Sequence, residues 1–397
     1  MKKILTLLLL NSCALVLHAQ PVLKSMLKLP DTGVTSGYTA TYGEDNDFNL
    51  DVPLLTVNAN GTVMDSITGL LWQQLDGGEM TIENALVYCD TLTLGGFTDW
   101  RLPTAHEAYS IMNLQHANPA LDTLVFTKTL AQYWWSSDRQ ANDSNKVWVT
   151  NSGGGIGNHP RTETISAGGA KRFHVRAVRQ VYTPQALLAH FNDNGDGTVT
   201  DVLTGLIWQQ VPYADSLSWE DALVYADTLT CGGIGDWRLP NVKEIQSINL
   251  ESVHHPSLDT AFFDVQTGKK FWSSTTLRNQ PVRAWYLDDQ FGITTYDLKT
   301  NRHEVLCVRG TPLITHIPTI DRAKPSIYPN PFERFIRLQG LPLDTYCQLF
   351  DAKGQCVWQG RFIEQQDFSF LNPGIYLLQP RVACTPAMKI IKSPQVD

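Results

Sequence analysis

Gly61-Thr62-Val63-Met64-Asp65, which leads into Thr68-Gly69-Leu70-Leu71-Trp72-Gln73-Gln74, is the stretch that decides the architecture, because the chain contains it twice. The second occurrence begins at Gly197-Thr198-Val199-Thr200-Asp201, 136 residues later, and again leads into Thr-Gly-Leu-Ile-Trp-Gln-Gln. Another segment, Gly95–Pro103, returns as Gly232–Pro240. Repetition at so long a period predicts two copies of one compact domain rather than a short-period solenoid.

Each copy opens with the pattern of a β-hairpin and continues with that of two short helices. The hairpin turn falls at Thr68-Gly69 and at the equivalent place in copy two. After the N-cap residues Thr81 and Ser218, apolar residues at i, i+3, i+4 and i+7 predict a helix with one buried face. Capping boxes beginning at Thr104 and Asn241 predict the second helix. Two helices packed on short strands indicate an α+β domain.

The two ends of the chain have their own compositions. Lys2 and Lys3 precede an apolar run, and Ala19 precedes the expected cleavage point, as in a signal peptide. No later stretch has the roughly 18 apolar residues of a membrane helix, so we expect no transmembrane segment after signal cleavage. The expected units are a signal peptide (1–20), a first domain with its lead-in (21–182), a second domain (183–310), a linker (311–325) and a C-terminal unit (326–397).

Four short motifs occur in both copies: the Thr-Gly-Leu-x-Trp-Gln opening, Asp-Trp-Arg-Leu-Pro from Asp99 and Asp236, Trp-Ser-Ser from Trp135 and Trp272, and a closing Val-Arg pair. Together they resemble the DUF1566 family, which includes the Lcl C-terminal domains. The resemblance implies two tandem C-type-lectin-like α+β domains. It also implies adhesion, with sulfated polysaccharide as the ligand class.

The C-terminal unit carries a second resemblance. Its motifs are Tyr328-Pro329-Asn330-Pro331-Phe332, the step from Gly374 to Tyr376, and the closing Lys389-Ile390-Ile391-Lys392. They resemble the C-terminal sorting domain of the type IX secretion system of Bacteroidetes. This implies a small all-β Ig-like sandwich, engagement of the type IX secretion machinery, and release from the cell or attachment to the outer-membrane surface. An ordinary Ig-like module retained in the mature protein is the alternative.

The composition favours a loop-rich extracellular protein. Charged residues make up 18% and aromatic residues 10%, and the net charge of −8 gives no support for nucleic-acid binding. Seven cysteines include Cys13 in the signal peptide. Cys307 aligns with an alanine in copy one, and Cys231 lies nearby in copy two, so we predict a Cys231–Cys307 disulfide in an oxidising compartment.

One stretch of copy one, from His159 to Gln180, is locally basic and follows a glycine-rich segment. Arg161, Lys171 and Arg172 have no basic counterparts in copy two. Because guanidinium forks match the geometry of sulfate and carboxylate, these three residues are predicted to contact an anionic glycan. The expected partner is therefore an extracellular polysaccharide, with a surface protein as the alternative.

Two short runs are acidic. Asp193, Asn194 and Asp196 place oxygen donors as in the front half of a Ca²⁺ loop. The carboxylate expected at the twelfth position is missing, because Leu203 stands there, so a Ca²⁺ site and a plain turn both remain open. The other run, Glu44-Asp45-Asn46-Asp47, is predicted to be a solvated loop.

Motifs for catalysis are incomplete. His106-Glu107 and His303-Glu304 begin like the helix of a zinc protease, but the second histidine is absent in both places. No Gly-x-Ser-x-Gly elbow and no phosphate loop occurs in the sequence. We therefore predict a non-enzymatic adhesin-like protein that binds polysaccharide. The alternative is a structural or protein–protein interaction module of the cell envelope.

Overall fold

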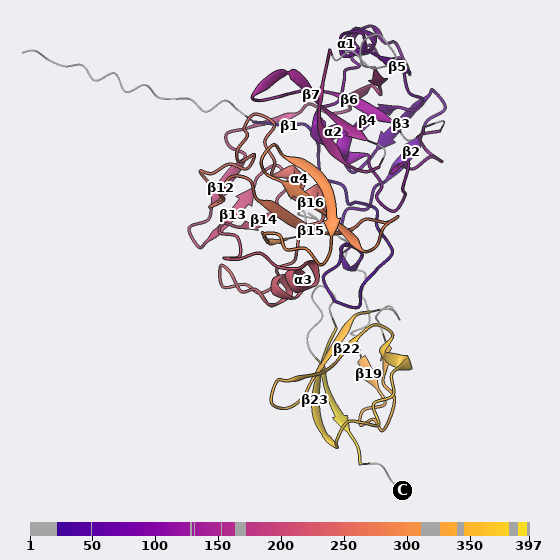
Figure 1. The fold of residues 1–397 in the computed structure, drawn as a ribbon. Coiled ribbons are helices and arrows are strands. Elements are labelled where there is room, and N and C mark those ends of the chain that lie inside the picture. The colour runs from indigo at the N-terminus through magenta and orange to yellow at the C-terminus, as the bar shows by residue number, and fades with distance from the viewer. Residues whose placement is uncertain are drawn as a thin grey trace, which may run out of the picture.

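The computed structural model describes residues 22–394, apart from 49, 128, 131, 152, 163–171, 311–325, 340–344 and 381–387. The expected signal peptide and linker lie outside the described residues. Figure 1 shows copy one in purple, copy two in pink to orange, and the C-terminal unit in yellow beyond them. The fold is mostly β, with 34% strand and 11% helix. The prediction of two tandem C-type-lectin-like α+β domains is wrong, because helices of ten and six residues are too short to form a layer.

Each copy contains one four-stranded antiparallel sheet, built on the repeated opening motif. The predicted hairpin is confirmed in both copies, and the closing Val-Arg strand pairs with its second arm through Val178–Trp72 and Val308–Trp208. In copy one the sheet consists of β2 (Leu55–Val57), β3 (Thr62–Asp65), β4 (Leu70–Gln73) and β10 (Val178–Gln180). In copy two it consists of β12 (Phe191–Asp193), β13 (Thr198–Asp201), β14 (Ile207–Gln209) and β18 (Val308–Arg309).

The helices begin at the predicted caps. The side chains of Thr81 and Ser218 accept hydrogen bonds from the first turn of the longer helix in each copy. Both predicted capping boxes, at Thr104 and Asn241, are formed at the shorter helix. The helices are α1 (Ile82–Thr91) and α2 (Ala105–Ser110) in copy one, and α3 (Trp219–Thr228) and α4 (Val242–Ser247) in copy two.

A single eight-stranded sheet runs through both copies. Its order is β15-β16-β17-β8-β7-β6-β9-β5, and the copies join where β17 pairs with β8 at Thr294 and Ile156. The strands β6-β7-β8 and β15-β16-β17 are equivalent in the repeat, so an approximate two-fold axis passes through the junction. The strands of copy one are β5 (Glu79–Met80), β6 (Tyr133–Gln140), β7 (Asp143–Asn151), β8 (Ile156–Pro160) and β9 (Phe173–His174). Those of copy two are β15 (Lys270–Thr276), β16 (Arg283–Asp288) and β17 (Ile293–Leu298).

A hydrophobic cluster also crosses the junction. The equivalent tryptophans Trp148 and Trp285 are both buried in it, together with Tyr109 of α2 and Val242 of α4. The two short helices contact each other there. Burial of two tryptophans between the copies favours one continuous body over two independent domains.

The lead-in before copy one passes over both copies. Its first strand, β1 (Val22–Lys24), pairs with β11 (Gln185–Leu187) at the start of copy two. Further along, the 3₁₀ turn Asp45–Asp47 contacts β15. The acidic run predicted to be solvated is instead buried, since Glu44 and Asp45 are only 1% and 2% exposed. That prediction was wrong because copy two supplies hydrogen-bond donors that a local sequence pattern does not reveal.

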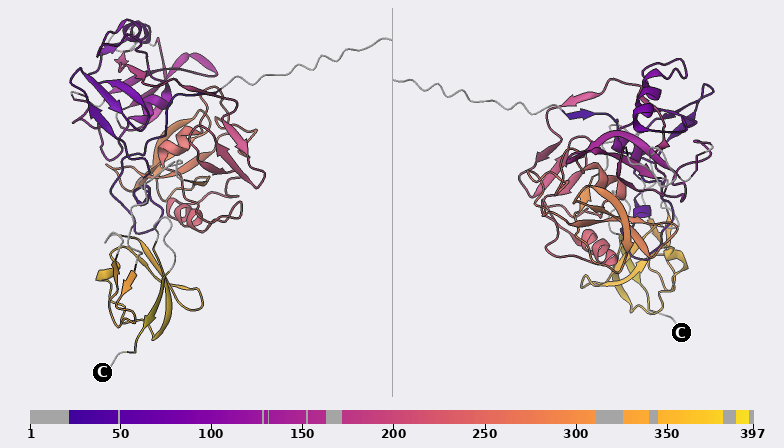
Figure 2. Two further views of the ribbon diagram at one scale, coloured as in Figure 1. Left: turned by 180° about the vertical axis from the view of Figure 1, so that it is seen from behind. Right: turned by 45° about the horizontal axis from the view of Figure 1, so that its top comes forward.

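Within its described residues, the C-terminal unit consists of β-strands and one 3₁₀ turn, Ile363–Gln365, and it has its own buried cluster around Phe332, Leu349 and Phe368. Figure 2, left, shows it below the two copies, and Tyr42 of the lead-in stacks on Tyr346 of this unit with 4.9 Å between the ring centroids. Its strands are β19 (Ser326–Tyr328), β20 (Arg337–Gln339), β21 (Cys347–Phe350), β22 (Cys356–Gly360), β23 (Gly374–Pro380) and β24 (Met388–Lys392). Among the described residues, no helix has the length and apolar character needed to cross a membrane.

Candidate functional site

The charged residues of the Asp-Trp-Arg motif are structural in both copies. Arg101 donates two hydrogen bonds of 2.7 Å to Glu107, and thereby ties the approach to α2 to its capping box. Arg238 does the same with Glu244 in copy two. The motif aspartate pairs with the closing strand instead, as Asp99 does with Arg179 at 2.6 Å. These pairs fix loops and leave none of these arginines for a ligand.

The three basic residues predicted to contact an anionic glycan are only partly described. Arg161 follows β8 and pairs with Glu83 of α1 at 2.6 Å, and this hydrogen bond lowers the pKa of Glu83. Arg172 is exposed, immediately before β9. Lys171 lies outside the described residues. One of the three side chains is thus held by an ion pair, and one is free to turn toward solvent.

A group of aromatic rings lies beside these arginines. Tyr133 of β6 stacks on Phe173 of β9 with 5.1 Å between ring centroids, and His159 of β8 meets the Tyr133 ring edge-on at 5.0 Å. Tyr133 is 41% exposed. We call Tyr133, His159 and Phe173 the aromatic patch. The sequence did not lead us to predict this patch. The one sign of it was a difference between the copies, since copy two carries Lys270 in place of Tyr133.

Another arginine of the basic stretch, Arg176, is buried. Its guanidinium donates to the carbonyl oxygens of Gln73 and Gln74 and to Thr129 Oγ1, and burial lowers its pKa to about 10. It also lies 4.6 Å from the ring centroid of Phe126. Arg176 therefore supports the inside of copy one and does not add to a basic surface.

The candidate Ca²⁺ loop is the turn between β12 and β13, and its oxygens take part in local hydrogen bonds. Asp193 Oδ1 accepts from the Gly195 amide at 2.8 Å, and Asp196 Oδ1 accepts from the Thr198 amide at 3.1 Å. Asn194 Oδ1 accepts from Thr200 Oγ1 at 3.0 Å. Within the described residues, no three His, Cys, Asp or Glu side chains form a metal-binding group. This geometry is that of a tight turn.

Cys231 and Cys307 are free thiols in the structure, so the predicted disulfide between them is not formed. Both nevertheless belong to the same group of packed side chains in copy two, and Cys307 is fully buried. Burial raises the pKa of the Cys307 thiol well above its usual range. A thiol in that state is a poor nucleophile and behaves as a small apolar side chain.

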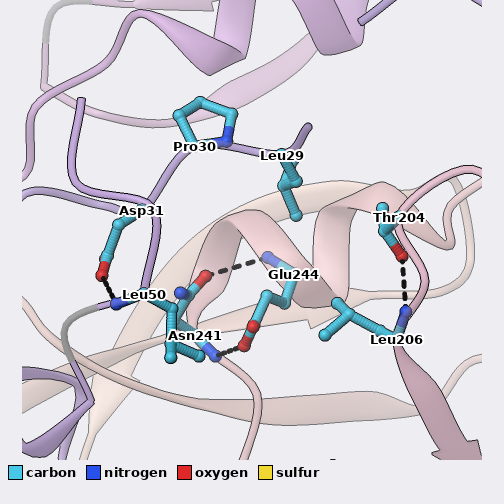
Figure 3. Close-up of a pocket in the computed structure, with 8 residues that line it drawn as sticks. All are labelled: Leu29, Pro30, Asp31, Leu50, Thr204, Leu206, Asn241 and Glu244. Atoms are coloured by element: carbon cyan, nitrogen blue, oxygen red, sulfur yellow. Dashed lines mark hydrogen bonds between the residues drawn. The ribbon is translucent and has the colours of Figure 1, made fainter. Parts of the chain in front are cut away.

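Two cavities lie where the lead-in meets copy two, and the larger of them also reaches copy one. The smaller, of about 10 Å³, has room for about one water molecule. Figure 3 shows it between Asp31 of the lead-in, Glu244 of α4 and Asn241, which caps that helix. The larger is a cleft of about 230 Å³ that includes His106, Asp138 and Glu251 in its lining.

The sequence belongs to a known family. The Lcl C-terminal domain family matches residues 61–179 and again residues 197–309, together more than half of the chain, so the protein is a member of that family with two domain copies. No curated protein matches the chain.

One solved structure similar to this chain is PorZ, an essential surface component of the type IX secretion system of Porphyromonas gingivalis. The identity is 10%, the match covers 66% of this chain and 30% of PorZ, and the TM-score is 0.16. The chain thus spans less than a third of PorZ, and a superposition this poor supports no inference about fold or function.

Proposed function

We propose that this protein is a non-enzymatic, secreted or surface-attached protein that binds acidic polysaccharide through the aromatic patch and the adjacent arginines of copy one. The observation that carries the proposal is the exposed ring of Tyr133 on β6, in the same sheet as β8, which Arg161 follows, and β9, which Arg172 precedes. Sugar rings present C–H faces that stack on aromatic rings, which combine apolar area with polar edges. Guanidinium groups bind sulfate and carboxylate through paired hydrogen bonds.

The proposed cellular location of the protein rests on sequence features at the two ends of the chain. A signal peptide at 1–20 would direct the chain out of the cytoplasm, and a type IX sorting domain at 326–397 would take it across the outer membrane. The released or surface-attached protein would then present copy one to extracellular polysaccharide.

A glycan array with the intact purified protein tests this function. We expect selective binding to sulfated or uronic-acid glycans, and loss of that binding in Tyr133→Ala and in the Arg161→Ala, Arg172→Ala double variant. Arg278→Ala removes an exposed arginine of copy two and serves as the matched control. Parallel arrays with Ca²⁺ and with chelator test whether the turn at Asp193, Asn194 and Asp196 takes part.

A second candidate is a structural or protein–protein module of the cell envelope. The shared sheet and shared core favour it, because copies fused into one body lose the flexible spacing by which tandem modules gain avidity. A blank array in both buffers, with a stable protein partner recovered from the cell surface, would favour this candidate over polysaccharide binding.

A further inference from the structure

The approximate two-fold axis relates two places at the junction of the copies. Each consists of the start of the short helix in one copy, the strand that follows, and the end of the short helix in the other copy. In one place these are Lys243 of α4, Thr275 of β15 and Ser110 of α2; in the other they are His106, Asp138 and Ser247, each offset by 137 residues. We call the first the filled site and the second the open cleft.

The lead-in occupies the filled site. Lys243 Nζ donates to the carbonyl oxygens of Asp31 and Ser110 at 2.8 and 2.7 Å. Thr275 Oγ1 donates to Asp45 Oδ2 at 2.6 Å, and Thr32 Oγ1 donates to the same oxygen at 2.9 Å. Figure 3 shows the margin of this site, where the Asp31 carboxylate accepts from the Leu50 amide. The filled site therefore holds an acidic peptide segment of the chain itself.

The lead-in forms only one wall of the open cleft. The cleft volume is about 230 Å³, against about 10 Å³ beside the filled site. All three parts of the junction contribute to its lining. These residues are Leu23, Lys24, Ser25, Met26, Lys28 and Leu29 of the lead-in, Thr104, His106 and Asp138 of copy one, and Leu203, Thr204, Ser247 and Glu251 of copy two.

At one position the open cleft presents a hydrogen-bond acceptor where the filled site presents a donor. Asp138 stands where Thr275 stands, and both accept a hydrogen bond from the first helical amide, from Ala105 at 2.6 Å and from Val242 at 3.0 Å. The hydroxyl of Thr275 is left to donate to a carboxylate. Asp138 has no such proton when ionised, and its Oδ2 accepts from the Ala105 amide. At this position a ligand meets an acceptor instead of a donor.

The positive charges of the open cleft are balanced by nearby carboxylates. His106 Nε2 lies 2.9 Å from Glu251 Oε1, and Lys28 Nζ lies 2.8 Å from Asp51 Oδ1. Burial lowers the pKa of Lys24, and the carboxylate of Asp201 works against this shift. With Asp138 included, the cleft offers no excess positive charge that would attract an acid.

From this reversal we propose that the open cleft binds one uncharged sugar unit, whose hydroxyl groups donate to Asp138 and Glu251 and whose C–H faces contact Leu23, Met26, Leu29 and Leu203. The lining combines four apolar side chains with polar and charged residues that can fix the orientation of a ring, and the volume suits a single small ring rather than a drug-sized ligand. The site lies apart from the aromatic patch and takes the opposite ligand chemistry, so it does not depend on the function proposed above.

The test uses the intact protein with glucose, galactose, mannose, fucose and N-acetylglucosamine, screened by saturation-transfer NMR and then measured by calorimetry. At least one sugar is expected to bind. Asp138→Asn, which retains the hydrogen bond from Ala105, should weaken binding about tenfold, because a hydrogen bond to a charged acceptor is lost. Ser25→Phe should abolish binding by filling the cleft. Asp90→Asn, an exposed aspartate on α1, is the matched control and should leave binding unchanged.

Thermal unfolding of each variant shows whether it is folded, so lost binding is not mistaken for lost structure. The proposal is overturned if none of the five sugars binds the wild type, or if Asp138→Asn and Ser25→Phe bind as well as Asp90→Asn. It is also overturned if a synthetic peptide of residues 41–50 binds the wild type in place of the sugars and fails to bind Ser25→Phe. The cleft would then recognise an acidic segment of a second copy. The Arg161→Ala, Arg172→Ala variant should retain sugar binding, which separates this site from the aromatic patch.

Discussion

The filled site and the open cleft occupy equivalent places, yet they differ in the residues that face the junction. Lys243 is 1% exposed and is bonded to the lead-in, whereas the side chain of His106 is 23% exposed and faces the cleft. Thr275 is bonded to Asp45, and its counterpart Asp138 lines the cleft. The difference indicates that one of two equivalent sites at a duplicated junction can be filled by the chain itself, while the other stays accessible to a ligand.

The largest effect is expected from the core that both copies share. Trp148→Ala removes a side chain that is 1% exposed and should lower the free energy of unfolding by about 3–5 kcal/mol. Buried thiols report on each copy separately, Cys89 for copy one and Cys307 for copy two. Thiol labelling in urea should show both cysteines becoming reactive at the same, lowered midpoint. A shift at Cys89 alone would mean that the copies unfold independently.

The next effect distinguishes the two junction sites. Lys243→Met leaves the carbonyl oxygens of Asp31 and Ser110 without their donor and removes a buried cation that interacts with the carboxylates of Asp31 and Asp45, which should cost about 3 kcal/mol. His106→Met, the same change on the other side of the axis, should cost about 1 kcal/mol because that ion pair is partly exposed. Equal losses in the free energy of unfolding, measured in urea, would contradict the distinction between the filled site and the open cleft.

A smaller effect depends on pH. Burial lowers the pKa of His106, but the carboxylate of Glu251 outweighs burial and raises it to about 9. Because the folded pKa lies above the unfolded value, the stabilisation is fully present below about pH 6.5 and is lost as pH rises through 9. The stability advantage over His106→Gln should therefore fall by about 1–2 kcal/mol across that window. A constant difference between pH 6 and 9.5 would show that the pair is not ionised.

The smallest effect is expected at the turn between β12 and β13. Asp193→Asn keeps an acceptor for the Gly195 amide and should change stability by less than about 0.5 kcal/mol. Calcium should leave the midpoint of thermal unfolding unchanged in both proteins, since the oxygens of the turn are used in local hydrogen bonds. A calcium-dependent rise in the wild type that is absent in Asp193→Asn would identify a metal site.

Local features of this fold follow from local sequence. Hairpin turns, N-caps and capping boxes depend on residues within a few positions of one another, and those at Thr68-Gly69, Thr81 and Thr104 are confirmed. The fold class was predicted wrongly because it depends on pairing between distant segments. No local sequence pattern indicates the pairing of Ile156 with Thr294. Without this pairing the strands of the two copies do not form one long sheet.

The candidate sites show the same limit. The basic residues were found from composition, but only the structure reveals that Arg161 is paired with Glu83 and that Arg176 is buried. The junction sites were not found at all, because each requires the lead-in and both copies together. A residue-by-residue comparison of the copies would have shown the substitutions at His106 and Asp138, although not where those side chains lie.

The most direct test of the account is amide hydrogen exchange at the junction of β8 and β17. The Ile156 amide donates to Thr294 Oγ1 at 3.1 Å, and both residues are almost completely buried. If the copies form one body, the Ile156 amide should exchange as slowly as the hydrogen-bonded amides of the central strands β7 and β16, at a rate set by global unfolding. Fast exchange of the Ile156 amide, with slow exchange in β7 and β16, would contradict the fused sheet and with it the junction sites.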